Sequence, residues 1–136
     1  MGGKSNYLED KVLNWALKAT AMGTAPTTVY VSLHNGDPLD TAAGGTEVTT
    51  TIRAAGRVSA AFGAITTNTG GNTVSNSALV DFGAAAAGAT FTHFGIFDAA
   101  SAGNMLYANA LTGGSQTVST GTNVSFAIGA IVVSEE

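Results

Sequence analysis

The sequence contains no cysteine and very little charge. Without cysteine, neither a disulfide framework nor a thiolate metal site can form. Charged residues make up 10% of the 136 residues, whereas a soluble domain usually has about 25%. Between residues 58 and 134 the charged residues are Asp81 and Asp98 alone. Few acids or bases are therefore available for catalysis, and the composition favours a structural protein over an enzyme.

The charge that is present excludes two classes of partner. The formal net charge is −4, and all five Lys and Arg residues lie at or before Arg57. A nucleic-acid or anionic-membrane partner would need a basic patch, which the rest of the chain cannot supply.

No run approaches the roughly 20 apolar residues of a membrane helix. Glu9 and Asp10 also stand where a secretory signal would be apolar. We expect a protein made in the cytoplasm that stays there or leaves inside a particle.

Residues 5–22 have the pattern of an amphipathic helix. Asn6 with Glu9 predicts a capping box, and Gly23 followed by Pro26 predicts the stop. The apolar residues that recur at three- and four-residue steps are Leu8, Val12, Trp15, Ala16, Ala19 and Met22.

Leu13 and Leu17 extend the apolar surface of this helix well round its cylinder. A single buried stripe would explain only the first set of apolar residues. Two interpretations remain open. Either the helix is half-sunk in its own core and both leucines are exposed, or the helix also contacts another subunit.

From residue 27 to residue 134 the pattern is typical of β-structure. Val29, Val31 and Leu33 alternate with polar residues, as in a half-buried strand. Residues 39–57 are expected to form an exposed arm. Further strands are predicted at 57–66, 73–82, 89–98, 104–111 and 123–133, separated by turns rich in glycine. The sequence thus predicts one mainly β domain over residues 1–136: an antiparallel β-sandwich or jelly-roll-like fold preceded by one amphipathic helix.

The last predicted strand is apolar at nearly every position from Phe126 onward, and it includes Ile128 and Ile131. A strand with one wet face would alternate between apolar and polar residues. This segment is therefore predicted either to be covered on both faces or to form part of an interface.

Four residues are candidates for a metal site: His34, Asp37, His93 and Asp98. They could converge only if two distant strands met at one end, and no H-x-H or H-x-x-x-H spacing supports this. Local hydrogen bonding is the favoured role of both histidines. No serine lies in a G-x-S-x-G elbow, and no glycine pair is followed by the Lys-Ser/Thr of a phosphate loop. We therefore expect no catalytic residue, no cofactor and no metal.

Three segments together resemble a family of small virion proteins of tailed phages. These are residues 5–14, the strand and turn TVYVSLHNGDP at 28–38, and THFGIFDA at 92–99; the family pattern continues through residues 103–107 and 126–129. Members are commonly labelled tail-fibre or minor structural proteins, and similar proteins decorate phage heads. The resemblance implies a virion location after synthesis in the host bacterial cytoplasm, a β-sandwich and no enzymatic residues.

A compact domain with neutral faces and no repeated shaft is suited to clamping capsid subunits. The main expectation is therefore a non-enzymatic capsid decoration (cement) protein. By analogy with the similar proteins that decorate phage heads, it would form a homotrimer on the capsid surface and bridge subunits of the major capsid protein. The alternative is a tail-fibre or tail-tip component that takes part in host attachment.

The residues expected to make these contacts lie in three segments. Arg53 and Arg57 are candidates for pairing with acids of the capsid partner, although they could equally be solvated strand ends. The full set of candidate interface residues is Leu13, Trp15, Leu17, Arg53, Arg57, Phe126, Ile128 and Ile131.

Overall fold

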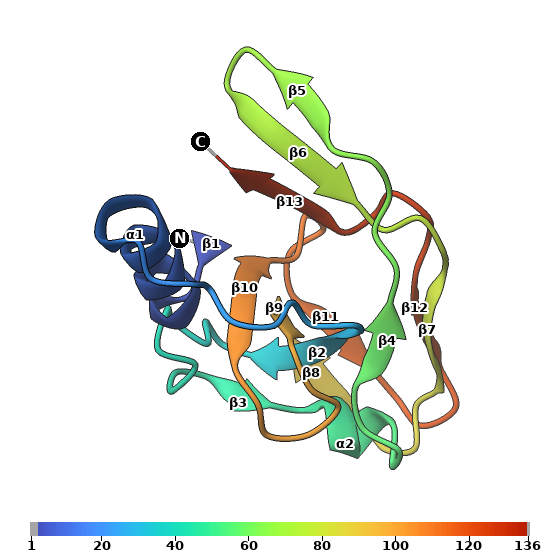
Figure 1. Cartoon of the computed structure of the whole chain (residues 1–136). Coiled ribbons are helices and arrows are strands. Elements are labelled where there is room, and N and C mark those ends of the chain that lie inside the picture. The colour runs from blue at the N-terminus through green and yellow to red at the C-terminus, as the bar shows by residue number, and fades with distance from the viewer. Residues whose placement is uncertain (1–2, 136) are drawn as a thin grey trace.

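A six-stranded antiparallel sheet organises the computed structural model, which describes residues 3–135 (Figure 1). Its strand order is β1-β10-β9-β2-β3, and β4 also pairs with β2. The helices and strands are β1 (Gly3–Lys4), α1 (Asn6–Lys18), β2 (Val29–Asn35), β3 (Thr46–Glu47), α2 (Thr49–Ile52), β4 (Val58–Ala60), β5 (Thr66–Asn68), β6 (Gly71–Ser75), β7 (Val80–Ala84), β8 (Ala89–Phe91), β9 (His93–Phe97), β10 (Met105–Ala110), β11 (Gln116–Val118), β12 (Asn123–Phe126) and β13 (Val132–Glu135).

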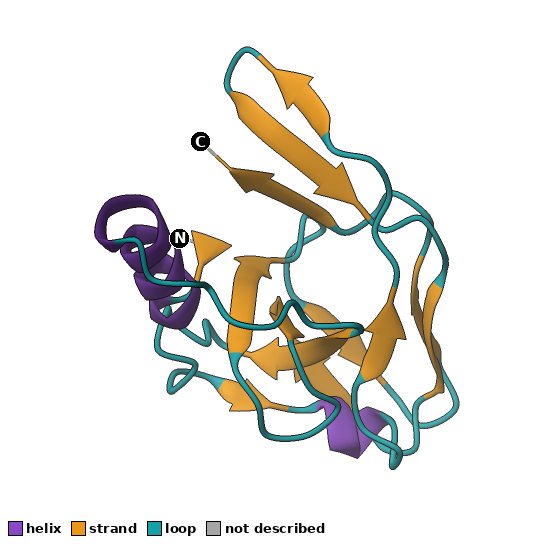
Figure 2. Cartoon of the chain, viewed as in Figure 1, coloured by secondary structure: helices purple, strands orange, loops and turns teal. Residues whose placement is uncertain are grey.

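Three smaller antiparallel sheets complete the fold: β11-β8, β12-β7 and β13-β6-β5. Strands dominate the described chain, and α1 lies at its edge (Figure 2). The expected mainly β, antiparallel architecture with one N-terminal helix is confirmed.

The core follows from the alternation in the central strands β2 and β9. Leu33 pairs with Phe94 and Val31 pairs with Ile96, and all four side chains are buried. Residues directly opposite each other in an antiparallel pair point to the same face, so these four form one apolar surface. Phe82 and Val124, from β7 and β12, pack in the same cluster. The core therefore lies between the large sheet and the smaller ones.

Helix α1 begins and ends at residues other than those predicted. Ser5 is the N-cap, and its side-chain oxygen accepts the Leu8 N–H at 3.3 Å, so the expected cap at Asn6 is wrong. Ser5 takes this role because its hydroxyl also reaches β10. The helix ends at Lys18 because Ala19 adopts a left-handed conformation, with φ of 54°, and donates its N–H to Asn14 O. The predicted extension to residue 22 is therefore also wrong.

The predicted exposed arm at residues 39–57 is wrong in its second half. Thr49 and Ile52 of α2 are fully buried. The Leu33 N–H donates to Thr49 Oγ1 at 2.8 Å, and the Val48 N–H donates to Leu33 O at the same distance. This segment has too few apolar residues to suggest burial. It is held in place by hydrogen bonds to the edge of β2, which are invisible in the local pattern.

Four of the predicted strands are divided in the structure. Predicted strand 57–66 contains β4 and only the first residue of β5, 73–82 spans β6 and β7, 89–98 spans β8 and β9, and 123–133 spans β12 and β13. The two parts of a divided strand pair with different partners; β12 pairs with β7, for example, whereas β13 pairs with β6. Strand β11 was not predicted.

Asn76 explains where the C-terminal segment breaks. Its side-chain oxygen accepts the Ile131 N–H at 2.8 Å, and its side-chain nitrogen donates to Ala127 O at 2.9 Å. Gly129, with φ of 79°, donates its N–H to Asn76 O. The turn between β12 and β13 is therefore organised by one buried amide. The expectation of a continuous apolar strand at 123–133 is wrong for this reason.

Candidate functional site

Helix α1 is attached to the sheet mainly at its N-terminal end. Strand β1 pairs with β10, placing Lys4 opposite Tyr107. The Ser5 N–H donates to Leu106 O at 2.9 Å, and the Ser5 hydroxyl donates to Met105 O. The Asn6 N–H donates to Asp40 O at 2.9 Å. These bonds fix where the helix starts.

Beyond that attachment, α1 presents large apolar side chains to solvent. Leu13, Trp15 and Leu17 are 55%, 60% and 77% exposed, and no residue of α1 is buried. Leu13 and Leu17 are four residues apart and share one face, whereas Trp15 lies on the opposite side. Leu8 and Val12 are half-buried, so contact with its own chain accounts for only part of the apolar character of α1.

A groove lies between the large sheet and the β13-β6-β5 sheet, and we call it the apolar groove. Its volume is about 210 Å³. Phe62 and the exposed Ile65 line it, as do Val74 of β6 and Val133 of β13. Apolar side chains supply most of its lining, so it is suited to an apolar side chain of a partner.

Glu135 forms the polar edge of the apolar groove. Its carboxylate pairs with the Lys4 ammonium and accepts the Tyr107 hydroxyl. Burial and this carboxylate raise the pKa of Tyr107, so the phenol remains protonated and continues to donate. These contacts link β1, β10 and β13 beside the groove.

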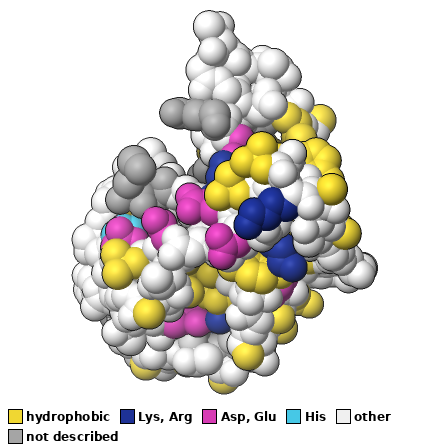
Figure 3. Space-filling view, turned by 60° about the vertical axis from the view of Figure 1, so that its left-hand side comes forward, with side chains coloured by type: hydrophobic (Ala, Val, Ile, Leu, Met, Phe, Trp, Pro, Cys, Tyr) yellow, Lys and Arg dark blue, Asp and Glu magenta, His cyan; other side chains and the backbone are white. Residues whose placement is uncertain are grey.

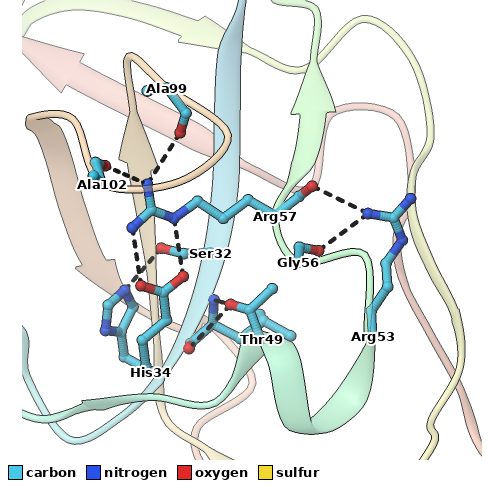
Figure 4. A network of polar contacts seen from close by, with 10 residues as sticks. Ser32, His34, Thr49, Arg53, Gly56, Arg57, Ala99 and Ala102 are labelled. Atoms are coloured by element: carbon cyan, nitrogen blue, oxygen red, sulfur yellow. Dashed lines mark hydrogen bonds and ion pairs between the residues drawn. The ribbon is translucent and has the colours of Figure 1, made fainter.

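A second cluster of polar contacts is centred on Arg57, whose side chain reaches Glu47 and the loop that follows β9 (Figure 4). Two nitrogens of Arg57 donate to the two oxygens of Glu47, each at 2.9 Å. A third nitrogen of Arg57 donates to Ala99 O at 3.0 Å and to Ala102 O at 2.8 Å. Burial alone would raise the pKa of Glu47, but the Arg57 guanidinium outweighs it and the pKa is lowered. Glu47 is therefore ionised at neutral pH.

His34 lies next to this ion pair and is buried. Its Nε2 lies 2.7 Å from Ser32 Oγ, and its ring is stacked near Phe97. Its Nδ1 is buried and has no partner among the described residues. Burial lowers the pKa of His34, and Arg57 lowers it further, against the opposing effect of Glu47. The fold therefore favours the neutral form of the imidazole.

The four residues considered for a metal site do not converge in the structure; each forms a local hydrogen bond instead. His34 and His93 lie opposite each other in β2 and β9, but His93 Nδ1 lies 2.7 Å from Thr92 Oγ1. Asp98 accepts the Asn104 N–H at 2.7 Å, and Asp37 accepts the Leu39 N–H at 2.9 Å. Within residues 3–135 no three His, Asp or Glu residues are grouped so that they could hold a metal ion.

The remaining candidate interface residues have different surroundings. Arg53 donates to Gly56 O and Arg57 O, both at 3.1 Å, so it braces its own loop. Ile131 is fully buried in the core, whereas Ile128 is 69% exposed. Phe126 is half-buried and lies edge-on to Phe82 and Phe94. In this segment Ile128 offers a partner the most surface, and the interface assignment itself stays a prediction.

Sequence reasoning missed the Glu47–Arg57–Phe97 cluster and the bridging role of Asn76. Ten residues separate Glu47 from Arg57, and 55 separate Asn76 from Ile131. No local periodicity links such positions. The one available signal was that Glu47 and Arg57 are rare opposite charges in a chain with few charges.

No helix in the described part of the chain is both long and apolar enough to cross a membrane.

The comparisons with known proteins give one family. The family described as "Podophage GP4 fiber I protein gp80" matches residues 3–134. No curated protein sequence matches the chain. A fibre description supports the tail-fibre alternative better than the expected capsid decoration protein. The match covers nearly all of the described residues, and the chain belongs to this family of phage fibre structural proteins.

Proposed function

We propose that this protein is a non-enzymatic structural component of a phage tail fibre. The family match over residues 3–134 carries the proposal. The charged and polar groups that could have served catalysis are used inside the fold, since Asp98 holds the loop at Asn104 and Arg57 holds Glu47. Their arrangement stabilises loops. Ser32 and His34 do place a hydroxyl beside an imidazole, but both side chains are buried, so a substrate cannot reach this pair.

The surface supports an assembly role for the same protein. Helix α1 presents Leu13, Trp15 and Leu17 to solvent, where another chain can cover them. The low charge downstream of Arg57 is consistent with apolar and hydrogen-bonded contacts rather than salt-dependent ones. The homotrimer expected from the resemblance stays a prediction.

The position and copy number of the protein in the virion test this proposal. The abundance relative to the major capsid protein should be measured in purified particles by quantitative mass spectrometry. Antibodies against the protein, seen by electron microscopy, should label the tail region. A tail fibre has few copies per particle, whereas labelling spread over the head with abundance near that of the major capsid protein would support capsid decoration instead.

Deletion of the gene separates the two roles further. Particles that lack a tail-fibre component should retain their DNA on heating but fail to adsorb to the host. Heads that leak DNA on heating, with adsorption unchanged, would contradict the fibre proposal. Alanine variants of His93 and Asp98 provide the test for an enzyme: loss of a catalytic activity with assembly intact would contradict a purely structural role.

A further inference from the structure

We infer that α1 of one copy docks on a second copy, with Trp15 seated in the second copy's apolar groove. The inference goes beyond the fibre role and is argued only from the exposed side chains and the groove of this chain. Trp15 is the one tryptophan of the sequence, and it is 60% exposed although its helix is well formed. Tryptophan is enriched among residues that dominate binding energy, where it fills a pocket of the partner.

The apolar groove has the right lining for an indole. Phe62, Ile65 and Val74 contribute apolar side chains, and the volume of about 210 Å³ suits one large side chain. Trp15 does not line the groove of its own chain. The molecule thus carries a projecting apolar group and an apolar groove on different parts of its surface.

Charge favours a second copy as the occupant over an unlike partner. Lys18 lies three residues after Trp15, on the same side of the helix, and forms no ion pair with any described residue. Glu135 stands at the edge of the groove, and a carboxylate that already binds Lys4 can accept further hydrogen bonds. When Trp15 enters the groove, Lys18 is placed near this acidic edge. Hydrophobic and charged side chains lie next to one another on the side that carries α1 (Figure 3).

A contact of this kind is heterologous, because the helix of one copy meets a different surface of the next. Such contacts close into rings when the rotation between copies allows it, and otherwise continue as filaments. A ring of three copies is one closed form. Helix-to-helix pairing through Leu13 and Leu17 would instead use the same surface on both copies, and the two arrangements can be distinguished.

The test is the oligomeric state of the purified full-length protein, measured by sedimentation velocity over a range of concentrations. Trp15→Ser removes the anchor, and Ile65→Asp places a charge in the groove at a position that is 70% exposed. Each variant should raise the dissociation constant at least about tenfold. Leu79→Ser is the matched control, since Leu79 is 56% exposed and lies outside the groove. It should associate like the parent.

Mixing the two variants gives the decisive result. A Trp15→Ser copy retains its groove and an Ile65→Asp copy retains its helix, so an equimolar mixture should form a dimer although neither variant associates alone. Failure of the mixture to associate would overturn the helix-in-groove arrangement. Association of each variant alone as tightly as the parent would also overturn it and would favour the isologous pairing through Leu13 and Leu17. A parent protein that stays monomeric at high concentration would overturn the second-copy assignment and point to another virion protein. Unchanged thermal unfolding of each variant shows that its fold is intact.

Lys18→Glu examines the charge argument separately. It should weaken association of the parent at low salt, and the difference should shrink at high salt because exposed charges are screened. Association that is unaffected by Lys18→Glu at low salt would remove Lys18 from the interface. The particle-labelling experiment reports on the fibre role alone, so failure of one proposal is distinguishable from failure of the other.

Discussion

The Arg57 guanidinium lies over the Phe97 ring, with its central carbon 3.5 Å from the ring centroid. The same guanidinium holds Glu47 of β3 and two carbonyls of the loop that follows β9. One side chain therefore connects three segments that the sheet alone would leave loosely joined. A planar, permanently charged group is needed for this geometry, because it stacks on the ring and donates in several directions at once.

Arg57→Lys should therefore lower the free energy of unfolding by about 2 kcal/mol. Lysine retains the charge but cannot form the bidentate ion pair with Glu47 or stack on the Phe97 ring. Urea unfolding monitored by circular dichroism gives the measurement. Lys18→Ala, at an exposed helix position, is the control and should change stability by less than about 0.5 kcal/mol. Equal effects of the two substitutions would contradict the role assigned to Arg57.

Asn76→Ala should lower the free energy of unfolding by about 3 kcal/mol. Asn76 is 1% exposed, and its amide forms hydrogen bonds with the Ile131 N–H and Ala127 O, which the substitution would leave without a partner. Asn76→Asp should be at least as harmful, since a carboxylate oxygen would face that carbonyl. Chemical denaturation measures both variants. Asn68→Ala, at an exposed position of β5, is the matched control and should be nearly neutral. A mild effect of Asn76→Ala would mean that the turn holds without the amide.

The stability of the protein should fall as the pH drops below about 6.5. The pKa of His34 in the fold is lowered from its usual 6.5, so the unfolded chain binds a proton that the folded chain excludes. The pKa of Glu47 is also lowered, from 4.5. Its contribution is present above that value and is lost at lower pH, as the pH falls through the folded pKa. Both groups therefore lower the stability of the fold as the pH falls, and the effect of His34 begins at the higher pH.

His34→Gln separates the contribution of His34 from that of Glu47. Glutamine can still face Ser32 but does not titrate, so the loss of stability between pH 7 and pH 5.5 should become smaller in this variant. Urea unfolding at several pH values, with the parent protein beside it, measures the slopes. Identical slopes for both proteins would assign the pH dependence to other groups.

Ser5→Ala should increase local opening of α1 while the rest of the fold stays nearly as stable as in the parent protein. The substitution removes the N-cap and the bond to Met105 O, at a cost of about 1 kcal/mol. Amide hydrogen exchange of residues 5–18 should become faster while exchange in β2 and β9 stays slow. Thr20→Ala, just beyond the helix, is the control. Unchanged exchange in α1 would show that pairing of β1 with β10 suffices to hold the helix.

Local patterns predicted the kind of each element better than its limits. The alternation of Val29, Val31 and Leu33 predicted β2, and the helical spacing from Leu8 predicted α1. The predicted strands at 73–82 and 123–133 were too long, because a run of apolar residues contains no information about where a chain changes partner. Ile131 shows this most clearly, since it ends a turn and fills the core instead of continuing a strand.

The candidate site was predicted only in part. The excess apolar surface of the helix was visible in the sequence, because Leu13 and Leu17 lie outside the stripe formed by Leu8, Val12 and Trp15. The apolar groove was not visible in the sequence. Its walls come from β2, the segment between β4 and β5, β6, β9, β10 and β13, which are far apart along the chain.

The sequence by itself determined the β-rich fold class, the single N-terminal amphipathic helix and the resemblance to phage virion proteins. These depend on composition, short periodicities and motifs, which are local properties. Only the tertiary structure decided that Arg57 binds Ala99 across 42 residues and that Asn76 binds Ile131 across 55. Long-range hydrogen bonds of this kind depend on how strands are brought together, and no short window of sequence contains both partners.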